Sequence, residues 1–400
     1  MLVLSFPLAA AFVTLCVVDS TAATRALAPD RSTFVTLLGR DTVAAESFVR
    51  SESRVEGDLF VRIPSTVHFH YAVDVGANGM PTHSVLETHP MAGGDVAEKR
   101  VTIDFGGDSV RVTVDSSGRH HTETHASANA SWPYFMTGFG SSYGLYESVG
   151  LYDLALAHLP PKMGDTVAGL AVHLATGQPV RRLYIRRSAT LVDFDYFRMA
   201  WNHVALDSAG RIASVDARET TEQTITTRAD GIDVLELAKQ FARRDRAGAS
   251  IGIASPQRTV RASLGGHLVV LIYSSPRLRG RHVLGSVVRY DKVWRSGANE
   301  ATLISLDKDV LIGGTLVPSG TYSLWTLPGR DGVQLIVNRQ RLQWGTEYHP
   351  DQDLARIPMT ATTASTPREE FSIAVNGAGN AGTLQIAWDT FVWSVTVQVK

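Results

Sequence analysis

The sequence predicts a mainly β protein of two domains, and three observations support this. Apolar and polar residues alternate with a period of two through most of the chain, which is typical of antiparallel strands with one buried face. Turn sequences rich in Gly, Asn, Asp and Ser separate these runs about every 10 residues. The length of 400 residues exceeds what one hydrophobic core usually fills. We expect an N-terminal curled antiparallel β-meander with one or two helices, followed by a C-terminal β-sandwich.

The first 26 residues are expected to be a signal peptide. The run "MLVLSFPLAAAFVTLCVV" is apolar, is slightly short for a membrane span, and precedes small residues that suit cleavage near Ala23 or Ala26. An uncleaved anchor is the alternative, because a signal usually begins with a basic residue and the first one here is Arg25. Cys16 is the only cysteine, so the mature protein would contain no thiol. We expect an exported protein, periplasmic or extracellular, with no transmembrane segment after signal removal.

Residues 27–248 are expected to form the meander, which would resemble a half-barrel. The alternation is clear in "RVEGDLFVRI" (54–63) and "TVHFHYAVDV" (66–75). Apolar residues recur at steps of three and four over 143–159, which predicts a helix, and a second helix is predicted near 233–246. Asp233 can cap its start, and basic residues with Gly248 can close its end. The meander is similar to half-barrels that carry lipids in bacterial envelopes, an analogy of architecture only.

Residues 250–400 are expected to form the β-sandwich. This part of the chain consists of strand and turn patterns without a helix of useful length. Its last strand is the clearest, with Phe391, Trp393, Val395, Val397 and Val399 alternating with other residues. A domain of about 150 residues is a usual size for two packed antiparallel sheets.

Several motifs of this C-terminal half are long and unusual in composition. They are "YSSPRLRGR" (273–281), "YDKVWRSGANEAT" (290–302), "DVLIGGTLVPSGTYSLWTLPG" (309–329), "LIVNRQRLQWGTEY" (335–348), "DLARIPM" (353–359) and "EEFSIAV" (369–375). With these motifs in this order, the half resembles the bacterial domain of unknown function 2911 family. The resemblance implies an exported bacterial protein. It implies no agreed activity, so no catalytic role is carried over from it.

A charged stretch in these motifs is the first candidate site. If residues 277–281 form a strand, their three arginines point to one face, where an anionic ligand could bind them. The alternative, which we favour, is an internal network in which Glu300 and Asp291 pair with arginines and Asn299 binds turn carbonyls. The candidate ligand-binding residues are Arg277, Arg279, Arg281, Trp294, Arg295, Asn299 and Glu300.

Histidines provide the second candidate site. His68 and His70 share a strand face, and two histidines at this spacing can chelate Zn²⁺ or Cu²⁺. The segment "HHTETH" adds His120, His121 and His125. The alternative is a solvated sheet face, because the spacing matches no standard zinc pattern and cysteine ligands are absent.

The composition limits the classes of function. A net charge of −1 gives little support to a nucleic-acid partner. We expect a non-catalytic envelope binding module for a small or lipid-like ligand, with no catalytic residue and no cofactor. The alternative is an envelope hydrolase, or an enzyme that depends on a divalent metal, using Glu300 or the histidine cluster.

Overall fold

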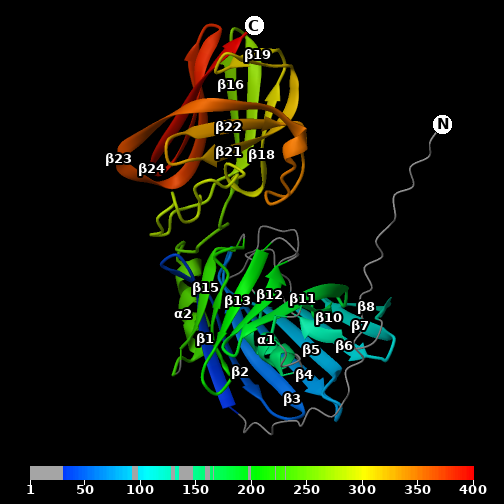
Figure 1. Cartoon of the computed structure of the whole chain (residues 1–400). Coiled ribbons are helices and arrows are strands. Elements are labelled where there is room, and N and C mark those ends of the chain that lie inside the picture. Colours follow the sequence, from blue (N-terminus) through cyan, green and yellow to red (C-terminus); the bar gives the residue numbers. More distant parts are fainter. Residues whose placement is uncertain are drawn as a thin grey trace, which may run out of the picture.

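The chain folds into two β-rich domains, each built on its own antiparallel sheet, as the alternation predicts (Figure 1). This computed structural model describes residues 30–91, 98–127, 131–134, 147–157, 163–164, 166–196, 200–220, 222–229 and 231–400. The predicted signal peptide lies outside the described residues. No helix of the described ranges is both long enough and apolar enough to cross a membrane.

Over the residues that the structure describes, the N-terminal sheet contains 15 strands. They are β1 (Asp30–Leu38), β2 (Asp41–Arg50), β3 (Arg54–Val61), β4 (Val67–Val75), β5 (Pro81–Pro90), β6 (Lys99–Phe105), β7 (Ser109–Ser116), β8 (Arg119–Ala126), β9 (Ser131–Tyr134), β10 (Thr166–His173), β11 (Pro179–Ser188), β12 (Leu191–Tyr196), β13 (Ala200–Leu206), β14 (Ile212–Asp216) and β15 (Thr224–Arg228). Strands β1 to β8 form one meander and β10 to β15 a second. Pairing of β1 with β15 joins them, and β9 pairs in parallel with β10 at the edge.

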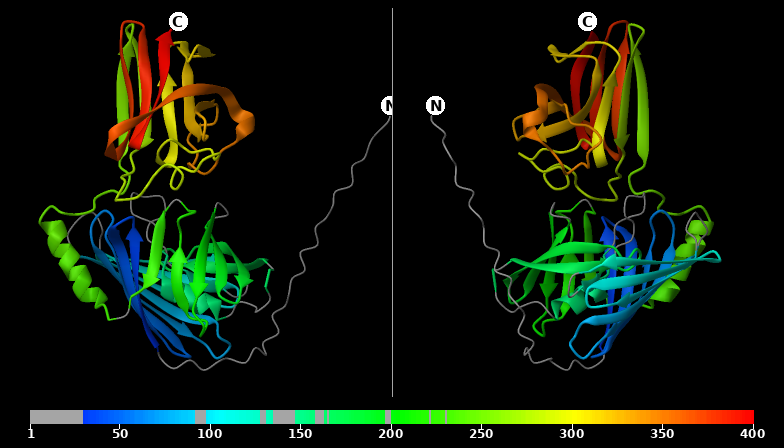
Figure 2. Two further views of the ribbon diagram at one scale, coloured as in Figure 1. Left: turned by 60° about the vertical axis from the view of Figure 1, so that its left-hand side comes forward. Right: turned by 90° about the vertical axis from the view of Figure 1, so that its right-hand side faces the viewer.

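The sheet curls around an apolar core on its inner face (Figure 2). Val55, Leu59, Tyr71 and Val73 are buried there, as the period-two pattern predicts. The curl brings the β10–β11 turn onto the opposite end of the sheet, since a Cβ on Gly177 would lie 1.9 Å from a methyl carbon of Val112 on β7. The inner face is therefore enclosed by the sheet's own strands.

Helix α1 (Val149–Leu156) lies inside the curl and is shorter than the predicted 143–159. Residues 143–146 and 158–159 of the predicted helix lie outside the described residues. The helix begins at Val149 because the Ser148 side chain accepts a hydrogen bond from the backbone N–H of Leu151. Glu46 on β2 accepts further bonds from the backbone N–H groups of Val149 and Gly150, at 2.7 and 3.1 Å. Contacts from a distant strand therefore set the start of this helix.

Helix α2 (Val234–Arg246) lies on the outer side of the sheet (Figures 1 and 2) and agrees closely with the predicted 233–246. The Asp233 side chain accepts from the backbone N–H of Glu236 at 2.9 Å, as expected of an N-cap. Three arginines occupy its last turn, and Gly248 has a φ of 80° just beyond it. Its apolar side packs on Ala45 and Phe60, which point away from the inner core.

The C-terminal domain contains a sheet of nine strands. They are β16 (Gln257–Leu264), β17 (His267–Ser274), β18 (Ala298–Leu306), β19 (Val310–Ile312), β20 (Thr315–Val317), β21 (Gly320–Pro328), β22 (Val333–Asn338), β23 (Asp353–Ala378) and β24 (Ala381–Val399). A single 3₁₀ turn, η1 (Pro350–Gln352), precedes β23. Strand β23 pairs first with β22 and then, from Thr360 onward, with β24, so it passes from one layer of the domain to the other.

The core of this domain lies between the two layers. Leu271 and Leu335 contribute from one layer, and Ile386 and Val397 from the other; all four are fully buried. The alternation predicted for the last strand is confirmed, since Phe391 and every second residue up to Val399 are buried.

Candidate functional site

The predicted arginine strand does not exist, and this corrects the first site prediction. Residues 275–297 connect β17 to β18 without forming a strand. Arg279 and Gly280 have φ angles of 49° and 75°, which interrupt extended backbone. Because alternate residues share a face only in an extended strand, Arg277, Arg279 and Arg281 point to different surroundings.

Two of these arginines bind groups of their own domain. Arg277 is exposed and forms loose ion pairs with Glu369 and Glu370, with N–O distances of 3.9 and 3.6 Å. Arg281 donates from Nε and Nη2 to the carbonyl oxygens of Leu278 and Arg277, at 3.0 and 2.7 Å. Arg281 therefore closes a local turn.

Arg279 reaches into the other domain. Its Nη1 lies 2.6 Å from a carboxylate oxygen of Asp41, at the start of β2, and its side chain is 5% exposed. Its Nε and Nη2 are buried and have no hydrogen-bond partner among the described residues. The backbone N–H of Arg40 donates to the Arg279 carbonyl oxygen at 2.8 Å. Arg279 thus joins the two domains through both its side chain and its backbone.

We call the contact of Arg279 with Arg40 and Asp41 the junction, and the neighbouring chain is adapted to it. Gly39 has a φ of 62°, and a Cβ there would lie 2.2 Å from the Arg279 carbonyl oxygen, so only glycine suits the position. The linker after α2 also packs on the first domain, because Ile251 and Ala254 contact an apolar group at the ends of β1 to β3. The two domains therefore meet through specific packing as well as one ion pair.

The remaining residues of the first candidate site lie in the "YDKVWRSGANEAT" stretch, and their roles are mainly structural. Trp294 is 7% exposed and lies among the rings of Phe371, Trp388, Phe391 and Trp393, with centroid distances of 5.3 to 6.4 Å. An indole enclosed in this way is part of the core rather than a surface for a ligand.

The other candidates of this stretch surround a turn. Asn299 has a φ of 57°, and its carbonyl oxygen accepts from the backbone N–H of Gly345 at 2.9 Å. Arg295 packs on the same turn, because a Cβ on Gly345 would lie 1.9 Å from its Cδ. Glu300 is exposed, and in the described chain no ion pair joins Glu300 or Asp291 to an arginine. The favoured pairing of these acids with arginines is therefore wrong.

The first histidine pair is placed as predicted, on the face of β4 that points away from the inner core. His68 and His70 both bind Asp58 on β3, at 2.9 and 3.1 Å. Burial alone would raise the pKa of Asp58, but the hydrogen bonds from the two histidines outweigh it and hold that pKa well below its usual range. The bond to Asp58 in turn raises the pKa of His70.

A cavity of about 250 Å³ on the outer face is lined by His70 but not by His68. Its lining is mixed in charge and includes Arg31, Ser47, Ser51, Arg54, Glu56, Asp58 and His70. Arg54 is held by Glu56 and Asp74, so most of these charges already have partners on neighbouring strands.

The other histidines lie on β8, which β5, β6 and β7 separate from β4 in the sheet. His120 binds Asp115 at 2.7 Å, and His121 and His125 lie within 3.7 Å of Glu123. The structure thus does not bring the two histidine groups together. Over the described ranges, no three His, Cys, Asp or Glu residues are grouped so that they could hold a metal ion.

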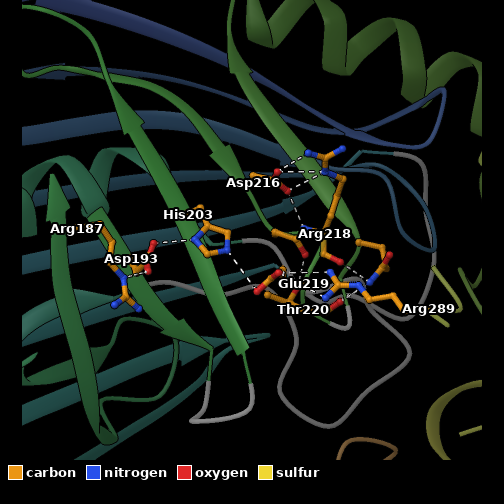
Figure 3. A network of polar contacts seen from close by, with 10 residues as sticks. Arg187, Asp193, His203, Asp216, Arg218, Glu219, Thr220 and Arg289 are labelled. Atoms are coloured by element: carbon orange, nitrogen blue, oxygen red, sulfur yellow. Dashed lines mark hydrogen bonds and ion pairs between the residues drawn. The ribbon is translucent and has the colours of Figure 1, made fainter. Parts of the chain in front are cut away.

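A polar network at a second contact between the domains was missed from the sequence (Figure 3). His203 on β13 lies between buried Asp193, 2.7 Å from its Nδ1, and Glu219, 3.4 Å from its Nε2. Both terminal nitrogens of Arg289, in the C-terminal domain, lie 3.5 Å from Glu219. Burial lowers the pKa of His203, but the bonds to the two carboxylates outweigh it, so the net shift is upward.

A second missed group is buried inside the curled sheet. Glu147, just before α1, binds Arg182 on β11 at 2.9 Å and the Asn202 amide on β13 at 2.7 Å. Glu222 lies close by, and one of its carboxylate oxygens is buried without a hydrogen-bond partner in the described chain. Burial, followed by the charge of Glu147, raises the pKa of Glu222 well above its ordinary value.

Comparison with known proteins bears on the C-terminal domain. Residues 255–397 match the model of a family described as a protein of unknown function (DUF2911). No curated protein matches the chain. A solved structure of a DUF1089 family protein from Pseudomonas aeruginosa is similar to this chain, with 12% sequence identity and a TM-score of 0.30. The match covers 44% of this chain and 90% of the other.

The family match lies within the domain formed by β16 to β24, and it covers the motifs that carry the expected resemblance. The prediction of that resemblance is confirmed. The C-terminal domain of this protein is therefore similar, over residues 255–397, to the DUF2911 family.

Proposed function

We propose that this protein is an exported, non-catalytic binding module that holds a small ligand where its two domains meet. One observation carries the proposal: Arg279 is buried between the domains with two nitrogens that have no hydrogen-bond partner among the described residues. A buried donor without an acceptor costs free energy, and folded proteins retain few of them. Ligand sites are frequent at domain interfaces, so these donors favour the junction as the place of binding.

The junction is a better candidate than the inside of the curled sheet. A lipid-like ligand would need an open apolar hollow. Helix α1 occupies that position, and six of its residues, Val149 to Tyr152 with Leu154 and Ala155, are buried against the inner face. This filling argues for a small ligand at the junction and against a lipid held within the meander.

Binding without catalysis is favoured by the surroundings of the candidate catalytic groups. Glu300 is exposed and remote from the histidines, and each predicted metal-binding histidine has a carboxylate within 3.7 Å. Asp193 and His203 have the arrangement of a general base with its orienting carboxylate. However, the Nε2 of His203 faces Glu219, so this nitrogen does not face a substrate position.

The proposal of export continues to rest on the apolar N-terminal run. It is tested by comparing the N-terminus and the cell fraction of the protein in its native host. Cleavage near residue 26 supports export, whereas an intact N-terminus in the cytosol contradicts it.

The binding function is tested by thermal unfolding of the mature chain with a panel of small molecules that includes neutral sugars, amino acids, sugar acids and phosphate esters. A binder raises the unfolding temperature by mass action, and we expect mass spectrometry to recover that compound unchanged. The R279Q variant should lose the shift and the E300Q variant should keep it. If no compound of the panel raises the unfolding temperature, the proposal is contradicted. A compound that is converted, with conversion lost in E300Q, would support the hydrolase instead.

A further inference from the structure

Arginines of both domains gather at the junction. Arg62 follows β3 and is 7% exposed, and its Nη1 donates to the Thr42 carbonyl oxygen at 2.8 Å. Its guanidinium carbon lies 3.6 Å from the ring centroid of Phe241 on α2, and that of Arg244 lies 5.5 Å from the same centroid. Arg62 is thus fixed in place by the first domain alone.

One arginine of each domain binds the start of β2, and the two residues that they bind are adjacent in the chain. Arg62 binds Thr42, and Arg279 binds Asp41, the residue before it. Arg281 belongs to the same turn as Arg279, since its backbone N–H and its Nε both donate to the Leu278 carbonyl oxygen, at 2.9 and 3.0 Å. The start of β2 is therefore contacted by one arginine from each domain, with a third nearby.

The positive charges at the junction are only partly balanced. Burial lowers the pKa of Arg281 to about 10, and the charge of Arg279 adds to this effect, while Glu369 and Asp41 oppose it. Burial also lowers the pKa of Arg62, to which Arg244 and Arg279 contribute, while Asp245 and Asp41 oppose the shift. Asp245 is already bound through one oxygen to the backbone N–H and hydroxyl of Thr66, both at 2.6 Å.

Donor groups at the junction exceed the acceptors available to them. Arg279 uses Nη1 for Asp41, while its Nε and Nη2 are buried without a partner in the described part of the chain. The Nε of Arg62 is also buried without a partner there. Both side chains are more than nine-tenths buried, so bulk water does not readily replace the missing acceptors.

We propose that the junction binds an oxyanion, the phosphate, sulfate or carboxylate group of a small molecule, between Arg62 of the first domain and Arg279 of the second, with Arg281 adding positive charge beside them. This inference rests on the proposed function and names the chemical class of its ligand. Guanidinium groups present N–H donors in a planar fork that matches an oxyanion and remain charged at physiological pH. The oxyanion supplies the acceptors that the unpartnered donors lack and offsets the excess of positive charge.

The experiment is calorimetric titration of the mature chain with sodium sulfate and with inorganic phosphate, against sodium chloride at equal ionic strength. We expect saturable binding of both oxyanions and none of chloride. Replacement of a charged donor should weaken binding about 10- to 100-fold in the variants R62Q and R279Q. Arg277 provides the matched control, because it belongs to the same segment but points to Glu369 and Glu370. The R277Q variant should bind within about twofold of the unmodified protein.

Loss of the Asp41 tie could unfold or separate the domains in R279Q, so R62Q and R281Q are measured beside it. Both keep the Arg279–Asp41 pair, and circular dichroism in chloride checks that they fold. Vesicles of phosphatidylglycerol, compared with phosphatidylcholine alone, distinguish a lipid headgroup from a free oxyanion as the source. Binding to these vesicles in an Arg62-dependent way also supports the oxyanion site.

Three results would overturn the inference: no binding of sulfate, phosphate or the anionic vesicles; equal binding by R62Q, R281Q and the unmodified protein; or an equal loss in R277Q. Failure here is distinguishable from failure of the proposed function. A protein that binds a neutral compound at the junction, with the loss in R279Q, but binds no oxyanion refutes this inference and leaves the proposed function standing. A protein that binds neither refutes both.

Discussion

The contacts of single polar residues, in the buried group around Glu147 and in the arginine segment, depend on neighbours that the sequence does not reveal. Arg182 and Asn202 stand on strands whose positions two residues away, Tyr184 and Val204, face the core. A period of two identifies a buried face, but it does not say which polar residues on that face pair across it. The arginine pattern failed for a related reason, because Arg279 leaves extended backbone and the rule of alternate faces no longer applies.

The first prediction concerns Glu222, whose pKa is raised in the folded protein. Because this pKa is raised, Glu222 makes its full contribution to stability only when the pH is below the pKa that Glu222 has in the unfolded chain. This contribution is lost as the pH rises from there to the folded-state pKa, so the ionised carboxyl opposes folding at neutral pH. We expect E222Q to unfold at a higher urea concentration than the unmodified protein at pH 7, with a smaller difference at pH 4.

Glu52 is exposed and serves as the control. E52Q should leave the stability unchanged at both pH values. Equal stability of E222Q and the unmodified protein at pH 7 would show that Glu222 is not held in an unfavourable ionised state.

At the scale of elements, sequence signals succeed where they are local. Helix α2 was predicted closely because its cap, its basic last turn and Gly248 are all within the helix or next to it. Helix α1 was predicted too long because its start depends on Glu46, about a hundred residues earlier in the chain. The strands followed their period-two pattern, but the order of the two meanders depends on the pairing of β1 with β15, which no local pattern indicates.

The second prediction concerns the start of α2. Removing the Asp233 side chain leaves the backbone N–H of Glu236 without its acceptor, so D233A should lower the free energy of unfolding by about 0.5–2 kcal/mol in urea denaturation. Asp331 is an exposed turn residue, and D331A should change that free energy by less than about 0.5 kcal/mol. Equal effects of the two substitutions would contradict the role of Asp233 as a cap.

At the scale of the whole molecule, the arrangement of the domains depends on contacts between residues far apart in the chain. Arg279 and Asp41 are 238 positions apart, and Arg289 and Glu219 are 70 apart. Composition and alternation predict two β domains but not which surfaces meet. For this reason the sequence left an anionic ligand for Arg277, Arg279 and Arg281 beside the favoured internal network, and it did not reveal that Arg62 of the first domain lies at the same place as Arg279.

The third prediction concerns pH and the network of His203. Asp193 accepts from Nδ1, so a neutral ring presents the bare Nε2 to the Glu219 carboxylate, and the two acceptors repel. The folded-state pKa of His203 is raised, so the His203–Glu219 pair is present at low pH and is lost as the pH rises through that pKa, which leaves Arg289 as the remaining partner of Glu219. We expect the NMR amide signals of Glu219 and Arg289 to titrate with the midpoint of His203.

In E219Q the Arg289 signal should no longer follow that midpoint, and the midpoint itself should fall. H83Q is the matched control, because His83 is also paired with a carboxylate, Asp104, but lies on the outer face of β5 and β6. An Arg289 signal that ignores the His203 midpoint would show that the network does not connect the domains.

The most direct test of the central claim, that the junction holds the ligand, is hydrogen–deuterium exchange of the mature chain in saturating sulfate against chloride at equal ionic strength. We predict slower exchange in residues 39–43, 61–64 and 277–282, which come from both sides of the junction, and unchanged exchange in the histidine strand 119–126. Slowing confined to one domain, or centred on 119–126 or 298–302, would contradict the account.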